Sequence, residues 1–140
     1  MTLPELPATG VTLSLSDQLA TRVAVAVARV LARQKPKQIK AALTKLRRGA
    51  RPATASEAQR ARDSVLTVSP RCSGGRACLL RSIASVVLCR IRGVWPVWCV
   101  GVLAAPPFTA HAWIEAQGQL IGEELDGACY QRLIEVGSAR

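Results

Sequence analysis

The sequence predicts an α+β fold in which a helix that begins with a cysteine packs on a small antiparallel sheet, preceded by basic helices. Three observations predict it. Apolar residues recur with a helical period through the first half, a Ser-Gly-Gly break precedes the helix that Cys78 opens, and short apolar runs between turn residues follow Gly93. With 140 residues, nearly half of them apolar, the chain is long enough for one domain with a real core.

The first predicted helix covers residues 16–34 and follows a proline-containing, extended start. Its apolar residues recur with a period near 3.6, so we expect them to form the face that packs on the core, while three arginines share another face. The apolar set is Leu19, Val23, Val27, Val30 and Leu31, and the basic set is Arg22, Arg29 and Arg33.

Two more helices are predicted before the break. Pro36 suits the first turn of a helix that runs to about Arg48, because its missing N–H has no partner to lose there, and Gly49 ends that helix. We expect it to bury Ile39, Leu43 and Leu46. Thr54 and Glu57 have capping-box spacing and predict a third helix over residues 56–68.

The second half predicts one helix followed by short strands. The helix runs from about Ala77 to Arg90, and Gly93 ends it. Gln117-Gly118 has the form of a two-residue hairpin turn, and Pro106-Pro107 separates two strands. The predicted elements are strands over residues 95–102, 109–116 and 119–122, and a short helix over residues 128–136.

The positive charge is concentrated in the first half. Of the net +10, residues 22–71 carry 13 Lys and Arg against two acids, whereas residues 72–140 carry six Arg against five acids. We therefore expect a basic helical part, residues 1–71, joined to a nearly neutral part, residues 72–140, within one compact domain. A basic half is compatible with nucleic acid, an anionic membrane surface or an acidic protein or peptide.

The sequence predicts neither a membrane span nor a secreted chain. Residues 93–114 are uncharged for 22 positions, but three prolines interrupt them, and a spanning helix would leave backbone groups unsatisfied in lipid. Residues 1–17 have no basic stretch followed by an apolar one, as a signal peptide requires, and the five cysteines are an odd number. We expect reduced thiols and a cytoplasmic location.

Cys78 is the candidate nucleophile. At the first turn of a helix, unpaired N–H groups and the positive end of the helix dipole stabilise a thiolate, and the same groups can stabilise an oxyanion. Small residues recur along that helix at Cys78, Ser82, Ser85 and Cys89, which would let a sheet approach closely. The competing interpretation is a small buried cysteine, the usual fate of a free thiol.

His111 is the only histidine, so any imidazole chemistry depends on it. Strand alternation places it on one face with Thr109, Trp113 and Glu115. A two-residue turn at Gln117-Gly118 would put Glu124 opposite His111, and a one-residue bulge would put Glu123 there. Asp126 is a weaker candidate. Thiol, imidazole and carboxylate in this order are what a cysteine hydrolase or acyl-transferase needs.

These residues resemble a known family. Cys-Leu-x-Arg-Ser at Cys78 followed by His-Ala-Trp-Ile-Glu at His111 is similar to the leader peptidase of lasso-peptide biosynthesis, a bacterial transglutaminase-like cysteine protease. The resemblance covers roughly residues 51–126, including the Arg-Pro-Ala-Thr-Ala-x-Glu helix start and the Arg-Ile-Arg-Gly stop. It implies Cys78 as nucleophile, His111 as base and, by spacing, Glu123 as the acid, where the family often has Asp.

The resemblance also implies a fold, a reaction and partners. The fold would be a transglutaminase-like or papain-like core. The reaction would be hydrolysis between leader and core of a ribosomally made precursor, freeing the amine that an ATP-dependent lasso cyclase then acylates, with no cofactor or metal. Because the chain has no room for a winged-helix-like recognition domain, it resembles the stand-alone peptidase of a split system that needs a leader-recognition protein.

Other function classes remain as alternatives. Acyl transfer to an amine uses the same three groups as hydrolysis. A zinc module is disfavoured because the cysteines lack short paired spacings. A nucleic-acid-binding protein would explain the basic helices, but these lack interleaved aromatics and a recognisable motif, so we expect no nucleic-acid partner.

Overall fold

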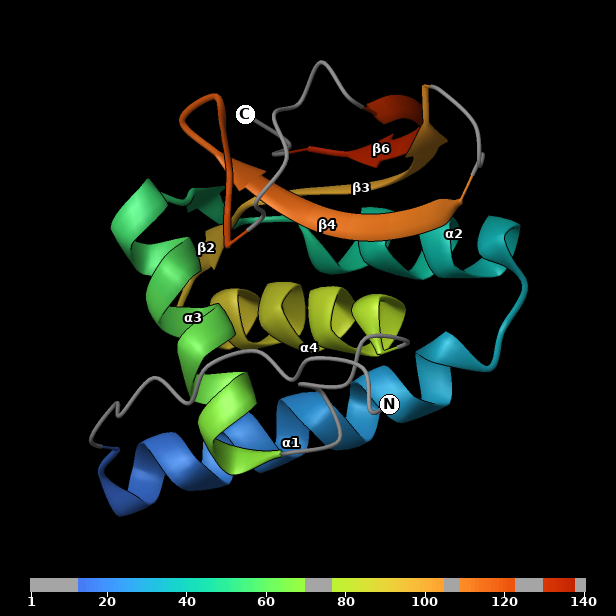
Figure 1. Cartoon of the computed structure of the whole chain (residues 1–140). Helices are drawn as coiled ribbons and strands as arrows, with labels where there is room; N and C mark the ends of the chain where they lie inside the picture. Colours follow the sequence, from blue (N-terminus) through green and yellow to red (C-terminus); the bar gives the residue numbers. More distant parts are fainter. Residues whose placement is uncertain (1–12, 70–76, 105–108, 123–129, 138–140) are drawn as a thin grey trace, which may run out of the picture.

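The computed structural model describes residues 13–69, 77–104, 109–122 and 130–137, and it confirms the predicted α+β fold class. Figure 1 shows helices on one side and a small sheet on the other. The elements in chain order are α1 (Leu15–Ala32), α2 (Pro36–Leu46), β1 (Arg51–Pro52), α3 (Ala55–Val68), α4 (Cys78–Ile91), β2 (Val94–Trp95), β3 (Val97–Leu103), β4 (Ala110–Ala116), β5 (Gln119–Leu120) and β6 (Tyr130–Val136).

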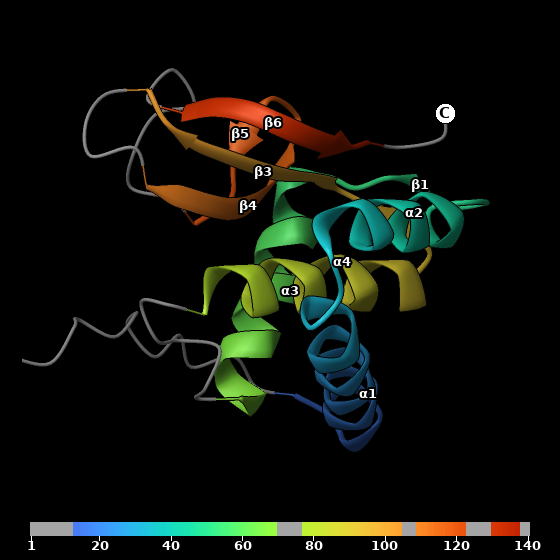
Figure 2. The same cartoon turned by 90° about the vertical axis from the view of Figure 1, so that its right-hand side faces the viewer.

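The main sheet is antiparallel, with strand order β5-β4-β3-β6, and the short β1 and β2 pair in parallel beside it. Helix α4 is the central element: it packs against β4 on one side and along α1 on the other. Figures 1 and 2 show this order of layers, from the sheet through α4 to α1. The cysteine-bearing helix therefore lies between α1 and the sheet.

Helix α4 is buried along most of its length, from Arg81 to Cys89. The small residues predicted to admit the sheet do so: Ser82 and Ser85 are almost completely buried. The indole N–H of Trp98 on β3 donates to the Ser82 hydroxyl at 3.0 Å, which satisfies a polar group that would be costly to bury alone. Small side chains on α4 thus allow a large strand residue to pack on it.

The N-terminal helices begin where the capping residues predict. Thr54 and Glu57 form the expected capping box at α3, and Arg51 binds the Glu57 carboxylate at 2.6 and 3.0 Å. At α2, Ile39 and Leu43 are buried as predicted, but Leu46 is 36% exposed. The C-terminal end of α2 is held by Arg90 of α4, whose guanidinium donates hydrogen bonds to the carbonyls of Leu46 and Arg48.

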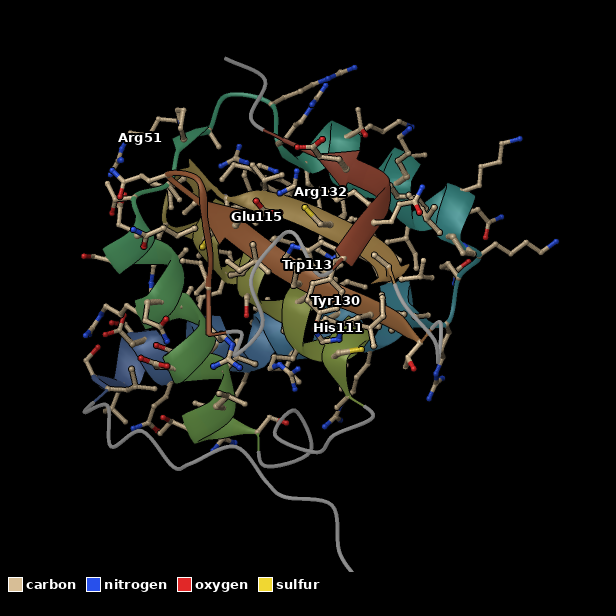
Figure 3. The ribbon with its side chains drawn as sticks, turned by 45° about the horizontal axis from the view of Figure 1, so that its top comes forward. Arg51, His111, Trp113, Glu115, Tyr130 and Arg132 are labelled. Carbon is tan, nitrogen blue, oxygen red and sulfur yellow. The ribbon has the colours of Figure 1, made fainter. Side chains whose placement is uncertain are left out.

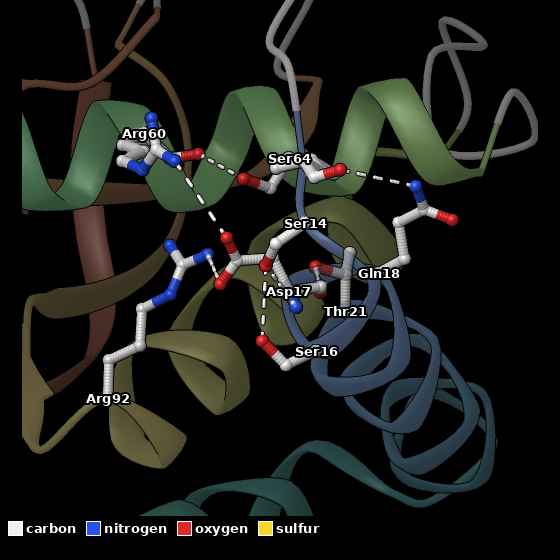
Figure 4. Close-up of polar contacts among 9 residues, drawn as sticks. Ser14, Ser16, Asp17, Gln18, Thr21, Arg60, Ser64 and Arg92 are labelled. Atoms are coloured by element: carbon white, nitrogen blue, oxygen red, sulfur yellow. Dashed lines mark hydrogen bonds and ion pairs between the residues drawn. The ribbon is translucent and has the colours of Figure 1, made fainter.

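Helix α1 is fixed to its neighbours by polar contacts at its N-terminus (Figure 4). The Ser14 hydroxyl accepts a hydrogen bond from the Asp17 N–H, as an N-cap does. The Asp17 carboxylate lies 3.6 Å from the Arg92 guanidinium at the end of α4 and 4.0 Å from that of Arg60 on α3. One carboxylate therefore joins three helices.

The predicted packing face of α1 is wrong except at Leu31, which packs partly buried against the core. Small residues face α4, and Thr21, Ala24 and Ala28 are completely buried. Most of the predicted apolar residues point outward instead, with exposed fractions of 65% for Leu19 and 62% for Val30. The helical period alone cannot show which face of α1 is buried, because two of its faces hold apolar residues. Close packing of α1 on α4 favours the face with the smaller side chains.

The predicted helix over residues 128–136 is also wrong where the structure describes it. Residues 130–136 form β6, which pairs antiparallel with β3 and has an irregularity opposite Val100 and Gly101. Without β6, the backbone N–H and C=O groups along that edge of β3 would have no strand partner. A helix over the same residues would satisfy only its own backbone groups and leave those of β3 unpaired. The Val136 carbonyl also accepts the indole N–H of buried Trp95 at 3.1 Å, which anchors the end of the strand.

Candidate active site

Cys78 is the first residue of α4 and is partly buried. The preceding residue, Ala77, has no side-chain oxygen to cap the helix, so no side chain of the N-cap residue occupies the first-turn N–H groups. These groups and the positive end of the helix dipole stand where a thiolate would form. The local structure is the one that the sequence predicts for an activated thiol.

The structure brings Cys78 and His111 together. Burial raises the pKa of the Cys78 thiol, but a hydrogen bond with the His111 ring and another with the backbone of Ala112 outweigh this effect. The charges of His111 and Arg81 act in the same direction as the hydrogen bonds, and the net result is a Cys78 pKa below its ordinary value. A thiol and an imidazole from distant parts of the chain therefore form one polar pair.

His111 lies in an aromatic stack on β4. Its ring is stacked on Tyr130 of β6, with centroids 5.3 Å apart, and on Trp113, with centroids 5.9 Å apart. Trp113 and Tyr130 are themselves 4.9 Å apart. Gly101 on β3 makes room for this stack, because a Cβ there would lie 2.9 Å from the Trp113 ring and 2.2 Å from the Gln131 carbonyl oxygen. Three strands thus position the imidazole.

The predicted acids, Glu123, Glu124 and Asp126, lie outside the described residues. The predicted two-residue turn is present: Gln117 and Gly118 both have positive φ, and Glu115 pairs with Leu120. Strand β5 covers only Gln119–Leu120, however, instead of the expected residues 119–122. At Gly122, φ is +71°, and an added Cβ would collide with the Arg62 guanidinium, so the chain departs from the strand over that side chain.

Glu115 is the carboxylate that the structure adds to the site region, with an exposed fraction of 7%. Arg132 of β6 donates to it twice, at 2.6 and 2.9 Å, and the Trp113 indole N–H donates at 2.9 Å. Burial raises the pKa of Glu115, but these hydrogen bonds and one from Cys99 lower it on balance. Figure 3 shows Arg132, Glu115, Trp113, Tyr130 and His111 in a row across the sheet.

Strand alternation places Glu115 on the face of His111 but assigns it no role. A charged residue in the middle of a strand, directly after Trp113 and Ile114, is itself a signal of a buried ion pair. Its partner could not be identified in the same way, because Arg132 belongs to a segment that the sequence predicted as a helix. The error at β6 therefore hid both Arg132 and Tyr130 from the predicted site.

Two other cysteines are unsuited to act as nucleophiles. Burial raises the pKa of Cys89 to about 12. Burial and the nearby Glu115 carboxylate also raise the pKa of Cys99, whose thiol lies 3.3 Å from that carboxylate. Both thiols stay protonated at neutral pH. Among Cys78, Cys89 and Cys99, the cysteines that the structure describes, Cys78 alone has a lowered pKa.

The chain belongs to the transglutaminase-like superfamily, whose family model matches residues 21–135. Members of this superfamily are generally cysteine-type enzymes, which agrees with a thiol at a helix start beside a histidine. No curated protein and no solved structure matches the chain significantly. Within the described ranges, no group of His, Cys, Asp and Glu could hold a metal ion, and no helix has the length and apolar character to cross a membrane.

Proposed function

We propose that this protein is a cysteine peptidase that removes the leader from a ribosomally made lasso-peptide precursor. One observation carries the proposal: the only histidine of the chain hydrogen-bonds to a thiol of lowered pKa at a helix start. The superfamily supports a cysteine-type enzyme. The Cys-Leu-x-Arg-Ser and His-Ala-Trp-Ile-Glu motifs support leader removal, through the resemblance described above.

The chemistry requires two steps. In the first, the Cys78 thiolate attacks the carbonyl carbon of the last leader residue, and the oxyanion that forms accepts hydrogen bonds from N–H groups at the start of α4. The His111 imidazolium gives its proton to the departing amine of the core peptide, which leaves a leader thioester on Cys78. In the second, His111 takes a proton from water, the hydroxide displaces the thiolate, and the leader leaves as a carboxylic acid.

Glu123 is proposed as the acid that holds the imidazole in its reactive tautomer, on the spacing that the resemblance implies. Glu124 and Asp126 are the competing positions. The two-residue turn favours Glu124 by register alone, since the described pairing of β4 with β5 ends at Leu120. Single Ala variants of the three acids distinguish these assignments, because the true partner of His111 loses the most turnover.

The outward face of α1 is proposed as the docking surface for the leader-recognition protein. Five aliphatic side chains form a row about 22 Å long on this helix, and Arg22 and Arg29 lie exposed beside them. A contiguous exposed apolar row of this kind marks a binding surface. Its chemistry fits a partner with an apolar groove and an acidic rim. The row consists of Leu15, Leu19, Val23, Val27 and Val30.

The proposed activity is tested by cleavage of a precursor peptide. The chain is incubated with precursor and recognition protein, and products are identified by mass spectrometry. We expect leader and core fragments from the wild-type chain and none from Cys78→Ala, while the matched variant Cys89→Ala keeps its turnover. Full cleavage by Cys78→Ala would overturn the thiol mechanism.

The same reaction separates hydrolysis from acyl transfer. With an added primary amine, a transferase forms a leader amide, whereas a peptidase forms the free leader acid. We expect the acid as the main product. The lasso cyclase is the proposed consumer of the core peptide, because cleavage leaves the free amine that it acylates.

A further inference from the structure

We propose that Glu115 is a positioning residue that holds the His111 imidazole in place through the Trp113 indole. This inference rests on the proposed function in one respect, that His111 is the base. It adds a second carboxylate to the site, distinct from the acid sought among Glu123, Glu124 and Asp126. Glu115 acts through another side chain, because its carboxylate is hydrogen-bonded to Arg132, Trp113 and Cys99.

The first step of the argument is that Glu115 is itself rigid. Its carboxylate is buried, and a buried charge persists only when it is paired and hydrogen-bonded. The Arg132 guanidinium supplies two parallel N–H donors at 2.6 and 2.9 Å, a bidentate geometry that fixes the carboxylate plane. The Cys99 thiol adds a third contact at 3.3 Å from β3. Groups on β3, β4 and β6 thus fix one side chain.

The second step is that Glu115 fixes the Trp113 ring. The indole N–H donates to the carboxylate at 2.9 Å, so the edge of the ring that carries the nitrogen is held by the ion pair. The other side of the ring faces Gly101, which has no side chain to push it away. A tryptophan that is both hydrogen-bonded and packed has one orientation available.

The third step is that the ring stack passes this constraint to His111. The His111 ring packs against both Trp113 and Tyr130, which also contact each other, and its plane is inclined to theirs by 16° and 24°. A change of the imidazole orientation would therefore require Trp113 or Tyr130 to move. The His111 ring is also hydrogen-bonded to Cys78. The Glu115–Arg132 ion pair therefore influences how the imidazole is oriented toward the thiol.

Charged and titratable groups face both ends of this row. At the ion-pair end they are Arg132 and Glu135 on β6 and Cys99 on β3. At the imidazole end they are Cys78 and Arg81 on α4. Among them, Glu135 is exposed and makes no hydrogen bond to Trp113 among the contacts described. This makes Glu135 the matched control for removal of a carboxylate near Arg132.

The test uses the full chain and two readouts, the cleavage rate and the NMR signals of the His111 ring. Because the chain has a single histidine, its imidazole C–H signals are assigned without ambiguity. Stacking on two aromatic rings shifts these signals upfield. In Glu115→Gln we expect them to move toward the position of an unstacked histidine and to broaden, while Glu135→Gln leaves them unchanged.

For cleavage, we expect Glu115→Gln to lower kcat about tenfold to a hundredfold with little change in KM, because misplacing a catalytic group costs rate and not substrate binding. Trp113→Phe keeps a ring and the ion pair but loses the N–H donor, and we expect the same direction of change. This second variant decides the question if Glu115→Gln does not fold, since it leaves Arg132 paired.

The outcomes separate this inference from the proposed function. If the His111 ring signals move in both variants, the positioning role is supported. If the wild-type chain cleaves no precursor, the proposed peptidase activity is overturned, whatever the ring signals do. Cleavage by the wild-type chain with ring signals and kcat unchanged in Trp113→Phe and in folded Glu115→Gln would overturn the positioning role alone. A fall in KM and kcat together with unmoved ring signals would also contradict it.

Discussion

At the scale of single residues, the environment of each thiol decides its reactivity more than its exposure does. Cys78 is partly buried, and burial alone would make it a weaker nucleophile, yet the hydrogen bonds with His111 and Ala112 reverse the direction of the shift. Burial also raises the pKa of Cys99, and its carboxylate partner, Glu115, adds to that rise instead of opposing it. A cysteine thiol is therefore a nucleophile or an inert core group according to its surroundings and its hydrogen-bond partner.

A pH series of thiol alkylation tests this assignment without any substrate. Because the Cys78 pKa is lowered, we expect its alkylation by iodoacetamide to persist below the ordinary cysteine range, and to decline only as the thiolate is protonated at lower pH. In His111→Ala the hydrogen bond and the charge are lost, so the midpoint should move to higher pH. Peptide mapping by mass spectrometry gives the rate at each cysteine.

The two buried cysteines are the internal controls of the alkylation series. Cys89 and Cys99 should stay unmodified across the neutral range in the folded chain and react after unfolding, since burial raises both pKa values. An unchanged midpoint for Cys78 in a folded His111→Ala chain would show that the imidazole does not activate the thiol, whatever the cleavage assay reports.

At the scale of elements, local signals predict where helices begin more reliably than which face they bury. Thr54 and Glu57 fix the start of α3 through their own hydrogen bonds, which need no other part of the chain. The turn at Gln117-Gly118 is equally local. The Cys78–His111 pair follows from such signals, since each residue lies near one end of a correctly predicted element.

The missed parts depend on partners far along the chain. Residues 130–136 fit a helical period as well as an alternating one, and only the free edge of β3 makes them a strand. The face of α1 depends on how closely it can approach α4. Arg132, Tyr130 and the role of Glu115 followed from the same error, because a residue cannot be assigned to a site before its strand is placed.

Gly101→Ala tests whether the strand arrangement assembles the site. The new Cβ would lie 2.2 Å from the Gln131 carbonyl oxygen, so β6 or the Trp113 ring must shift. Overpacking of this kind costs about 1–3 kcal/mol in the free energy of unfolding, which urea denaturation measures. We also expect loss of cleavage, because the displaced strand carries Tyr130.

The control for this variant is Gly137→Ala at the other end of β6. A Cβ there would lie 3.9 Å from a methyl group of Val97, an ordinary contact, and the urea midpoint should stay within error of the wild type. Equal stability for the two variants would mean that β6 does not pair with β3 as described.

At the scale of the whole molecule, the charge and the exposed apolar row lie on the part of the chain that precedes the proposed nucleophile. Helix α1 lies on the far side of α4 from the sheet, so its outer face is separate from the stack around His111 (Figure 2). Substitutions on the outer face of α1 should therefore leave the stack around His111 unchanged. A nucleic-acid partner would also use the basic surface, with a steep loss of affinity as salt rises.

A double variant of α1 tests the docking surface. We expect Leu19→Gln with Val30→Gln to raise KM for precursor cleavage in the presence of the recognition protein about tenfold or more, with kcat and thermal stability kept, since neither side chain is buried in the free chain. Ile91→Gln is the matched control, an apolar residue 49% exposed on α4.

The alternatives give different results. Loss of binding to vesicles of anionic phospholipid, with precursor cleavage unchanged, would assign the α1 row to a membrane surface. Sequence-selective DNA binding that is lost with Arg22 and Arg29, in a chain that cleaves no precursor, would overturn the enzyme altogether. Unchanged KM in the double variant would remove α1 from the recognition interface.

Strand β6 has a consequence for how the molecule loses activity. It lies at the edge of the sheet, hydrogen-bonds to one neighbouring strand, and exposes residues 131–133 and Glu135 to solvent. Such a strand detaches at a lower free energy than the core around α4 needs to unfold. Since β6 supplies Tyr130 and Arg132, its detachment would release the stack around His111 while the helices remain folded. Warming or mild denaturant would then disrupt the site through local detachment of β6. The temperature at which cleavage stops would report the stability of this one edge strand. It would lie well below the temperature at which the whole domain unfolds.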